Sequence, residues 1–224
     1  MRTTVAGFLA GAVVLLGIEV SFSEEPPLTI VALGDSTTAG TPGFRSPLES
    51  PPAGSGNQRS QYAYWLMRRH PEWRVINQGV NGQRTDQILG RLQSSVLDFK
   101  PQVVIVLAGV NDLYQGYPAD WVKRNLTLIY DRCSKQKIRV MACTILPYNK
   151  AGPGIRARMR DVNRWIQAAS AERGFGFCDL FRVVEDPVRP WSLASTPDGL
   201  HPDPEGYRRI GEALADALER WLKN

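Results

Sequence analysis

The chain has 224 residues, of which 43% are hydrophobic and 22% are charged, and its formal net charge at pH 7 is +5. These proportions exclude a disordered or fibrous chain, and the length suits one substantial hydrophobic core. Because the lysines and arginines are scattered and form no long run, we expect a solvated basic surface and no nucleic-acid partner.

Residues 1–23 have the features of an export signal. Arg2 gives a short positive start, an apolar run follows over residues 5–18, and small residues at 21–23 suit a cleavage point. The apolar run is shorter than the roughly 20 residues that a bilayer span requires. We therefore predict a periplasmic or secreted protein whose single mature domain, residues 24–224, has no stable membrane span. An uncleaved membrane anchor is the alternative.

Apolar strand-like runs alternate with segments of helical period in the rest of the chain. Five runs have the continuous apolar character of strands covered on both faces, namely residues 28–33, 73–77, 102–108, 138–146 and 175–180. Apolar residues at spacings of three and four predict amphipathic helices over residues 122–133, 155–169 and 207–221. This alternation predicts an α/β fold, a three-layer α/β/α sandwich around a mostly parallel five-stranded sheet.

One irregular segment, residues 41–59, is rich in proline, glycine and serine and is too long for an ordinary connection. We interpret it as either a functional loop over a site or a mobile insertion. Together with residues 147–154, it is expected to form the pocket walls. The small and polar residues of both segments favour a short acyl group over a long fatty chain.

The three cysteines do not form a disulfide framework in this interpretation. Their number is odd, and Cys143 and Cys178 fall in strand-like runs, so we expect buried free thiols, with a Cys143–Cys178 bridge as the alternative. With only two histidines and dispersed cysteines, the sequence predicts no metal site. No glycine-rich phosphate-binding motif is present, so no cofactor is expected.

Polar, glycine-rich segments follow the first three predicted strands, at residues 34–36, 77–82 and 109–112. Another, residues 198–202, precedes the last predicted helix. Because sites in open parallel sheets form outside the carboxyl ends of the strands, we expect these segments to meet.

The meeting segments contain the groups that ester cleavage by a serine requires. Ser36 supplies a hydroxyl, and His201 is assigned as the base because the other histidine, His70, lies at a basic helix end where we expect exposure. Asp198, three residues before His201, is placed to accept the Nδ1 hydrogen. The expected oxyanion donors are the Ser36 N–H, a glycine N–H after the second strand and the Asn111 amide.

These motifs, in this order, resemble the SGNH, or GDSL-type, hydrolase family of esterases and lipases over nearly all of residues 28–215. The resemblance implies a flavodoxin-like α/β/α sandwich and aligns Gly82 with the glycine of the oxyanion hole, with Gly79 as the second candidate. Thr37 departs from the family pattern, which usually has leucine or isoleucine there, and we interpret this as a local packing change.

The sequence therefore predicts an exported, cofactor-independent serine esterase acting on short-chain or O-acetyl esters of small molecules or carbohydrates. Asp35 and Asp112 are expected to support the site as hydrogen-bond acceptors. One alternative is a lysophospholipase or thioesterase. A second is a non-catalytic glycan-binding module on the same scaffold, which predicts a missing or displaced triad member.

Overall fold

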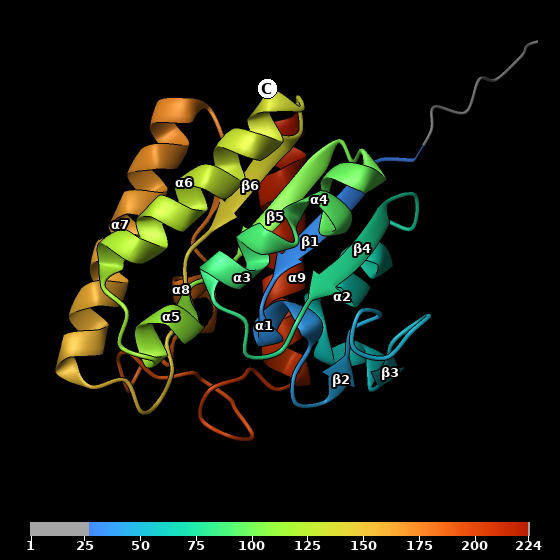
Figure 1. The fold of residues 1–224 in the computed structure, drawn as a ribbon. Coiled ribbons are helices and arrows are strands. Elements are labelled where there is room, and N and C mark those ends of the chain that lie inside the picture. Colours follow the sequence, from blue (N-terminus) through green and yellow to red (C-terminus); the bar gives the residue numbers. More distant parts are fainter. Residues whose placement is uncertain (1–26, 224) are drawn as a thin grey trace, which may run out of the picture.

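The computed structural model describes residues 27–223, so the predicted export signal lies outside the described residues. Its centre is a five-stranded parallel sheet with strand order β4-β1-β5-β6-β7 (Figure 1). The strands are β1 (Thr29–Gly34), β4 (Arg74–Gly79), β5 (Val103–Leu107), β6 (Arg139–Cys143) and β7 (Gly176–Cys178). The predicted sandwich and its sheet are confirmed. Within residues 27–223, none of the helices is long and apolar enough to cross a membrane.

Helices cover both faces of the sheet, because successive side chains of each buried strand point to opposite faces. Along β1, Val31 and Leu33 pack into one core cluster, while Ile30 and Ala32 pack into the other. The first cluster lies under α3 (Thr85–Gly90), α4 (Leu92–Ser95), α5 (Val110–Tyr114), α6 (Ala119–Lys135) and α7 (Pro153–Arg173). The second lies under α2 (Tyr62–Arg69), α8 (Leu180–Val184) and α9 (Pro204–Leu222), which are seen behind the sheet in Figure 1.

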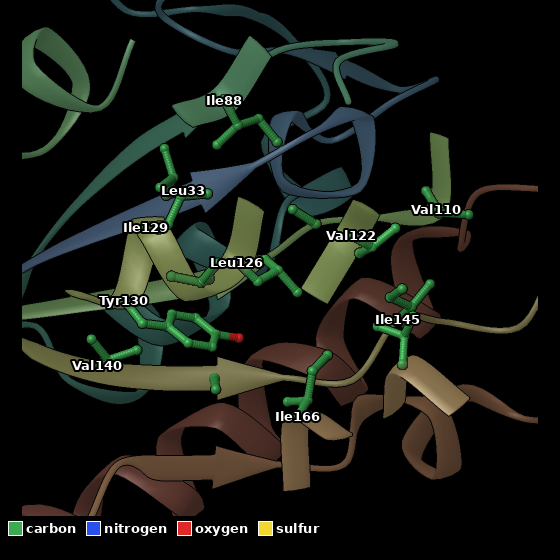
Figure 2. Packing of buried hydrophobic residues seen from close by; sticks show 14 of the residues in the cluster. Leu33, Ile88, Val110, Val122, Leu126, Ile129, Tyr130, Val140, Ile145 and Ile166 are labelled. Atoms are coloured by element: carbon green, nitrogen blue, oxygen red, sulfur yellow. The ribbon is translucent and has the colours of Figure 1, made fainter. Parts of the chain in front are cut away.

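The stripe predicted for residues 122–133 is the buried face of α6. Figure 2 shows Leu126 and Ile129 of this helix beside Leu33 of β1 and Val140 of β6, all of them nearly inaccessible to solvent. Burying a leucine or isoleucine side chain contributes roughly 1.5–3 kcal/mol. The strands whose ends carry the polar segments are therefore held by a closely packed hydrophobic core.

The irregular segment 41–59 is an ordered connection between α1 (Ser36–Ala39) and α2. It contains a short hairpin of β2 (Phe44–Arg45) and β3 (Ser55–Gly56) and the 3₁₀ helix η1 (Gln58–Ser60); a second 3₁₀ helix, η2 (Leu97–Phe99), precedes β5. The Ser46 hydroxyl donates to the Gly79 carbonyl at 2.6 Å, and the Tyr207 hydroxyl donates to the Thr41 carbonyl at 2.8 Å. These bonds hold the segment against the carboxyl end of the sheet.

The three cysteines are free and buried, as the sequence predicts. Cys143 and Cys178 are register partners on the neighbouring strands β6 and β7. Burial raises the pKa of the Cys133 and Cys178 thiols to about 12 and raises the pKa of Cys143 well above its usual value. Since the thiolate is the reactive form, these residues act as small apolar side chains.

Candidate active site

The polar segments meet at the carboxyl edge of the sheet, around β1 and β5. From β1 the chain passes to β4 on one side and then crosses to β5 on the other, so the connections that follow neighbouring strand ends diverge. Binding sites form at such a switch point, which we call the crevice. Ser36 lies two residues beyond the end of β1, Gly82 lies beyond β4 and Asn111 lies beyond β5.

Ser36 is the first residue of the one-turn helix α1 and is buried at the sheet edge. The Asp35 carboxylate caps this helix by accepting the Thr37 N–H at 3.0 Å. At Gly34, a side chain would begin 2.3 Å from the Leu107 carbonyl oxygen, so only glycine allows β1 and the turn to pack so closely against β5. The backbone of the first motif therefore fixes where the Ser36 hydroxyl points.

The structure brings Ser36, His201 and Asp198 together from 165 residues apart in sequence. The His201 Nε2 lies 2.9 Å from the Ser36 Oγ, and its Nδ1 lies 2.7 Å from the Asp198 Oδ2. The other carboxylate oxygen, Oδ1, accepts the backbone N–H groups of Leu200 and His201 at 2.9 and 2.8 Å. These three bonds fix the carboxylate, and the carboxylate orients the imidazole toward the hydroxyl.

The Asp198 carboxyl is held in its charged form. Partial burial acts to raise its pKa, but the hydrogen bonds from the His201 side chain and from the backbone N–H groups outweigh that effect and lower the pKa to about 2. A carboxylate that is ionised at neutral pH can stabilise an imidazolium on the histidine that it contacts.

Three N–H groups of the crevice are available to a ligand oxygen. The Ser36 N–H lies in the first turn of α1, where helical N–H groups have no partner within the helix. The Gly82 N–H has no hydrogen-bond acceptor among the described residues. The Asn111 amide donates to the Gln83 carbonyl at 2.9 Å, and because an amide carries two hydrogens, one remains free.

The structure distinguishes the two glycines that the sequence leaves open. The Gly79 N–H already donates to the Asn77 Oδ1 at 3.0 Å, and a side chain at Gly79 would begin 2.0 Å from the Ala39 nitrogen. Gly82 has a φ of +75°, and a side chain there would meet open space. Gly79 is therefore required for close packing against Ala39, whereas Gly82 forms a turn with a free N–H at the rim of the crevice.

The Asp112 carboxylate joins the segment that carries Asn111 to two helices. It accepts the Thr85 N–H at 2.9 Å and the Thr85 hydroxyl at 2.7 Å, and the Asn125 amide donates to the same hydroxyl at 3.0 Å. Burial raises the pKa of Asp112. Burial also raises the pKa of Asp35 to about 7, and the nearby Asp112 charge adds to that rise.

Arg91 connects the first and second polar segments beneath the crevice. Its guanidinium donates to the Gly34 carbonyl at 2.9 Å and to the Gln83 Oε1 at 2.6 Å, and the Gln83 carbonyl in turn accepts the Asn111 amide. Burial lowers the pKa of Arg91 to about 10, opposed by the Asp35 charge. One guanidinium nitrogen, Nη1, is buried without a partner among the described residues. Arg91 therefore holds the segments that carry all three N–H groups.

A model of the GDSL-like lipase/acylhydrolase family matches residues 32–209, most of the chain. The chain belongs to this family. An arylesterase from Vibrio mimicus is 26% identical over 194 residues, which make up 86% of this chain and 89% of that protein.

Solved structures of a lipolytic protein and of an acetylxylan esterase share the fold of this GDSL-like chain. A member of the G-D-S-L lipolytic family from Veillonella parvula matches with a TM-score of 0.71 at 18% identity, covering 86% of this chain and 98% of its own. Axe2, an acetylxylan esterase from Geobacillus stearothermophilus, matches with a TM-score of 0.67 at 22% identity, covering 85% and 93%.

In this GDSL-like protein, the segment 41–59 reaches the rim of the crevice. The Glu49 carboxylate accepts the Asn81 N–H at 2.7 Å, next to Gly82. A cavity of about 330 Å³ lies there, lined by Thr41, Pro42, Phe44, Arg45, Glu49 and Asn81. From residues 147–154, the Asn149 N–H donates to the Gly199 carbonyl at 2.8 Å, so this segment also borders the site.

Sequence reasoning did not single out Arg91 or Glu49. A signal for Arg91 was available, because Ile88, Leu92 and Val96 form a buried stripe at helical spacing and Arg91 lies beside it. A cation placed among apolar residues requires carbonyl or carboxylate partners. Glu49 carried no such signal, since its segment shows no periodicity.

The prediction that His70 is exposed is wrong. Its side chain is 18% exposed, its ring stacks on Trp73 at 3.7 Å, and its two nitrogens lie 2.8 Å from carboxylate oxygens of Glu72 and Glu219. It ends α2 and precedes β4, at the amino edge of the sheet and away from Ser36. Within residues 27–223, no three His, Cys, Asp or Glu side chains are grouped to hold a metal ion.

Proposed function

We propose that the protein is an exported serine esterase that hydrolyses carboxylic esters through an acyl-enzyme. The continuous hydrogen-bonded chain from Ser36 through His201 to Asp198 carries this proposal. A non-catalytic glycan-binding module does not require these hydrogen bonds, so their presence argues against that alternative.

The proposed reaction uses this hydrogen-bonded arrangement. The Ser36 Oγ attacks the ester carbonyl carbon while His201 Nε2 takes its proton, at a starting separation of 2.9 Å. The developing oxyanion accepts the N–H groups of Ser36, Gly82 and Asn111, and losing one such donor typically costs about 10²–10³ in rate. His201 then protonates the leaving alcohol and activates the water that hydrolyses the acyl-enzyme.

Short-chain or O-acetyl esters are the proposed substrates. The cavity beside the Gly82 turn has charged walls from Arg45 and Glu49, which suit a polar alcohol better than a long acyl chain. This favours an esterase over a lysophospholipase or thioesterase. The relatives named an arylesterase and an acetylxylan esterase are in keeping with it.

We further propose that residues 24–224 form the mature domain after removal of residues 1–23 as an export signal. The supporting evidence is the short positive start and apolar centre of the amino terminus. Amino-terminal sequencing of the protein recovered from cells tests this proposal, since an amino terminus at Met1 would contradict it.

Substitution of Ser36 by alanine tests the catalytic assignment. We expect kcat for p-nitrophenyl acetate to fall by roughly 10⁶-fold and labelling by a fluorophosphonate to disappear, because both require the hydroxyl. Ser94→Ala, at an exposed serine of α4, is the matched control and should retain both. Full turnover by a folded Ser36→Ala protein would refute the mechanism.

A further inference from the structure

A second cavity, of about 430 Å³, lies between α7, β7, α8 and the loop that follows α8. None of Ser36, Asp198 or His201 lines it, so it is separate from the proposed catalytic site. Its volume is in the range typical of small-molecule sites.

The cavity has an excess of positive charge on its α7 wall. Arg160 and Arg164 are four residues apart and share one face of that helix. Among the described residues, neither has a carboxylate partner within 4 Å. The cavity is therefore open to a ligand carboxylate.

The two carboxylates of the cavity are already engaged. Asp179 accepts the Thr144 hydroxyl at 3.0 Å and pairs with Arg182 at 3.4 Å. Glu185 accepts the Trp191 N–H at 2.9 Å. Neither carboxylate has Arg160 or Arg164 as its partner.

Aromatic side chains form the adjoining wall, where the Arg160 guanidinium lies over the Trp191 ring at 5.1 Å from its centroid. The rings of Phe181 and Trp191 meet edge to face with centroids 4.9 Å apart, and Phe177 of β7 also lines the cavity. Trp191 has a φ of +68°, a left-handed conformation that is unfavourable for a bulky residue. Because the Glu185 bond and the Glu185–Leu193 bridge hold it there, the backbone keeps a strained conformation that presents this ring.

From two guanidinium groups that lack a carboxylate partner and the aromatic wall beside them, we infer that this cavity binds a ring that carries a carboxylate. Planar guanidinium groups suit a carboxylate, and an aromatic face suits the flat side of a ring. The inference rests on the proposed function in one respect, since on that function the ring is a uronic acid unit of an acylated acidic polysaccharide.

The two cavities lie at one edge of the same sheet. In the strand order, β7 lies three strands from β1, which corresponds to roughly 14 Å at the usual strand spacing. The loops are also joined directly, because Asn149 accepts the Leu193 N–H at 2.9 Å and donates to the Gly199 carbonyl at 2.8 Å. One oligomeric substrate can therefore contact both the Trp191 loop and the turn that carries His201.

Direct binding tests the inference without any catalytic step. D-glucuronate, benzoate and D-glucose are titrated separately into the full-length protein, and the indole N–H resonance of Trp191, assigned with Trp191→Phe, is followed by NMR. We expect at least one of the carboxylates to bind about tenfold or more tightly than glucose, since a charge-assisted carboxylate bond exceeds a neutral one. A preference for glucuronate identifies a saccharide as the source of the carboxylate, and a preference for benzoate identifies an aromatic acid.

Variants separate the cavity from general charge effects. Arg160→Gln and Arg164→Gln should each reduce carboxylate affinity by about tenfold and leave hydrolysis of p-nitrophenyl acetate unchanged. The matched control is Arg124→Gln, because the Arg124 guanidinium lies over Trp121 at 4.9 Å outside the cavity. This control should not change the affinity.

Equal affinity for glucose and both carboxylates, or carboxylate binding that survives the double substitution of Arg160 and Arg164, would overturn the inference. Because this titration does not depend on turnover, it stays informative if Ser36→Ala refutes the esterase mechanism. Conversely, an active esterase that binds neither carboxylate retains its proposed function and loses only this site.

Discussion

Two kinds of carboxylate lie around the candidate site, and they differ in solvent exposure, in the direction of their pKa shift and in the groups that they contact. Asp198 lies on a loop, its side chain is 38% exposed, and its hydrogen bonds lower its pKa to about 2. Asp35 and Asp112 lie beneath the crevice, almost fully buried, and burial raises the pKa of each. The exposed carboxylate orients a side chain, whereas the buried pair holds backbone.

The difference indicates that proximity to the proposed nucleophile does not decide which carboxylate contacts the proposed base. Asp35 is adjacent to Ser36 in sequence, yet it contacts the Thr37 N–H, and no bond joins it to His201 among the described residues. Asp198 contacts the imidazole directly. The two kinds also titrate in opposite senses, so pH and substitution separate them.

Among the variants that compare these carboxylates, substitution of Asp198 by asparagine should give the largest effect on activity. We expect kcat for p-nitrophenyl acetate to fall by about 10³–10⁴-fold, because an amide no longer fixes the tautomer or stabilises the imidazolium. The free energy of unfolding should change by about 1 kcal/mol or less, as is usual for a partly exposed position. Steady-state kinetics and urea denaturation measure the two quantities.

Asp112→Asn is the contrasting variant, and it should cost about 1–3 kcal/mol of stability because one Thr85 donor loses its buried acceptor. Its effect on kcat should be smaller than that of Asp198→Asn. The reverse ranking of the two variants would contradict the division of roles.

The pH dependence of stability should reveal Asp35. The folded protein holds the Asp35 proton up to about pH 7, whereas the unfolded chain releases it near pH 3.8, so the folded state binds more protons between these values. The free energy of unfolding therefore falls as pH rises from about 4 to 7, by up to roughly 4 kcal/mol from this group, and is unaffected by it above that range.

Asp35→Asn should remove this fall, since asparagine does not titrate. Urea denaturation of both proteins between pH 4 and 8 measures the difference in their free energies of unfolding. Contributions from groups that the two proteins share cancel in this difference. Asp198 acts in the opposite sense, because its contribution is present above about pH 4 and is lost as pH falls toward 2. Parallel curves for wild-type and Asp35→Asn proteins would mean that Asp35 is ionised throughout.

Arg91→Met should give the smallest effect. We expect kcat to fall by about tenfold with KM unchanged, because the segments that carry the oxyanion donors lose a shared anchor while the triad stays intact. The pKa of Asp35 should rise further as its neighbouring cation is lost, which extends the pH range over which stability falls. Arg68→Met, on the exposed side of α2, is the control for charge removal. A change in KM alone would contradict a positioning role.

Much of the fold could be predicted because buried parallel strands have short, continuous apolar sequences. The ends of two strands were less predictable. The runs 138–146 and 175–180 extend beyond β6 and β7, which end at Cys143 and Cys178. After Cys178 the chain turns into α8, whose cap is the Asp179 side chain, so Leu180, the last residue of the predicted run, belongs to a helix.

The site was predictable where motif and contact lie close together in sequence. Asp198 and His201 are three residues apart, and Ser36 lies two residues beyond a strand end, so pattern and topology were sufficient to bring them together. Arg91 and His70 depend on partners distant in sequence. His70 is half-buried because Glu219, 149 residues later, reaches its ring, and no local pattern encodes that contact.

Because the proposed base and its carboxylate lie on one short turn, an inactive state of the protein requires movement of that turn alone. The proposed nucleophile and anion-binding groups are anchored at the sheet edge, whereas the proposed base and its carboxylate lie on a separate turn just before α9. Displacement of that turn alone would stop the proposed cleavage and leave the other groups of the crevice in place. Such a protein would capture an ester and hold it unreacted until the turn returned.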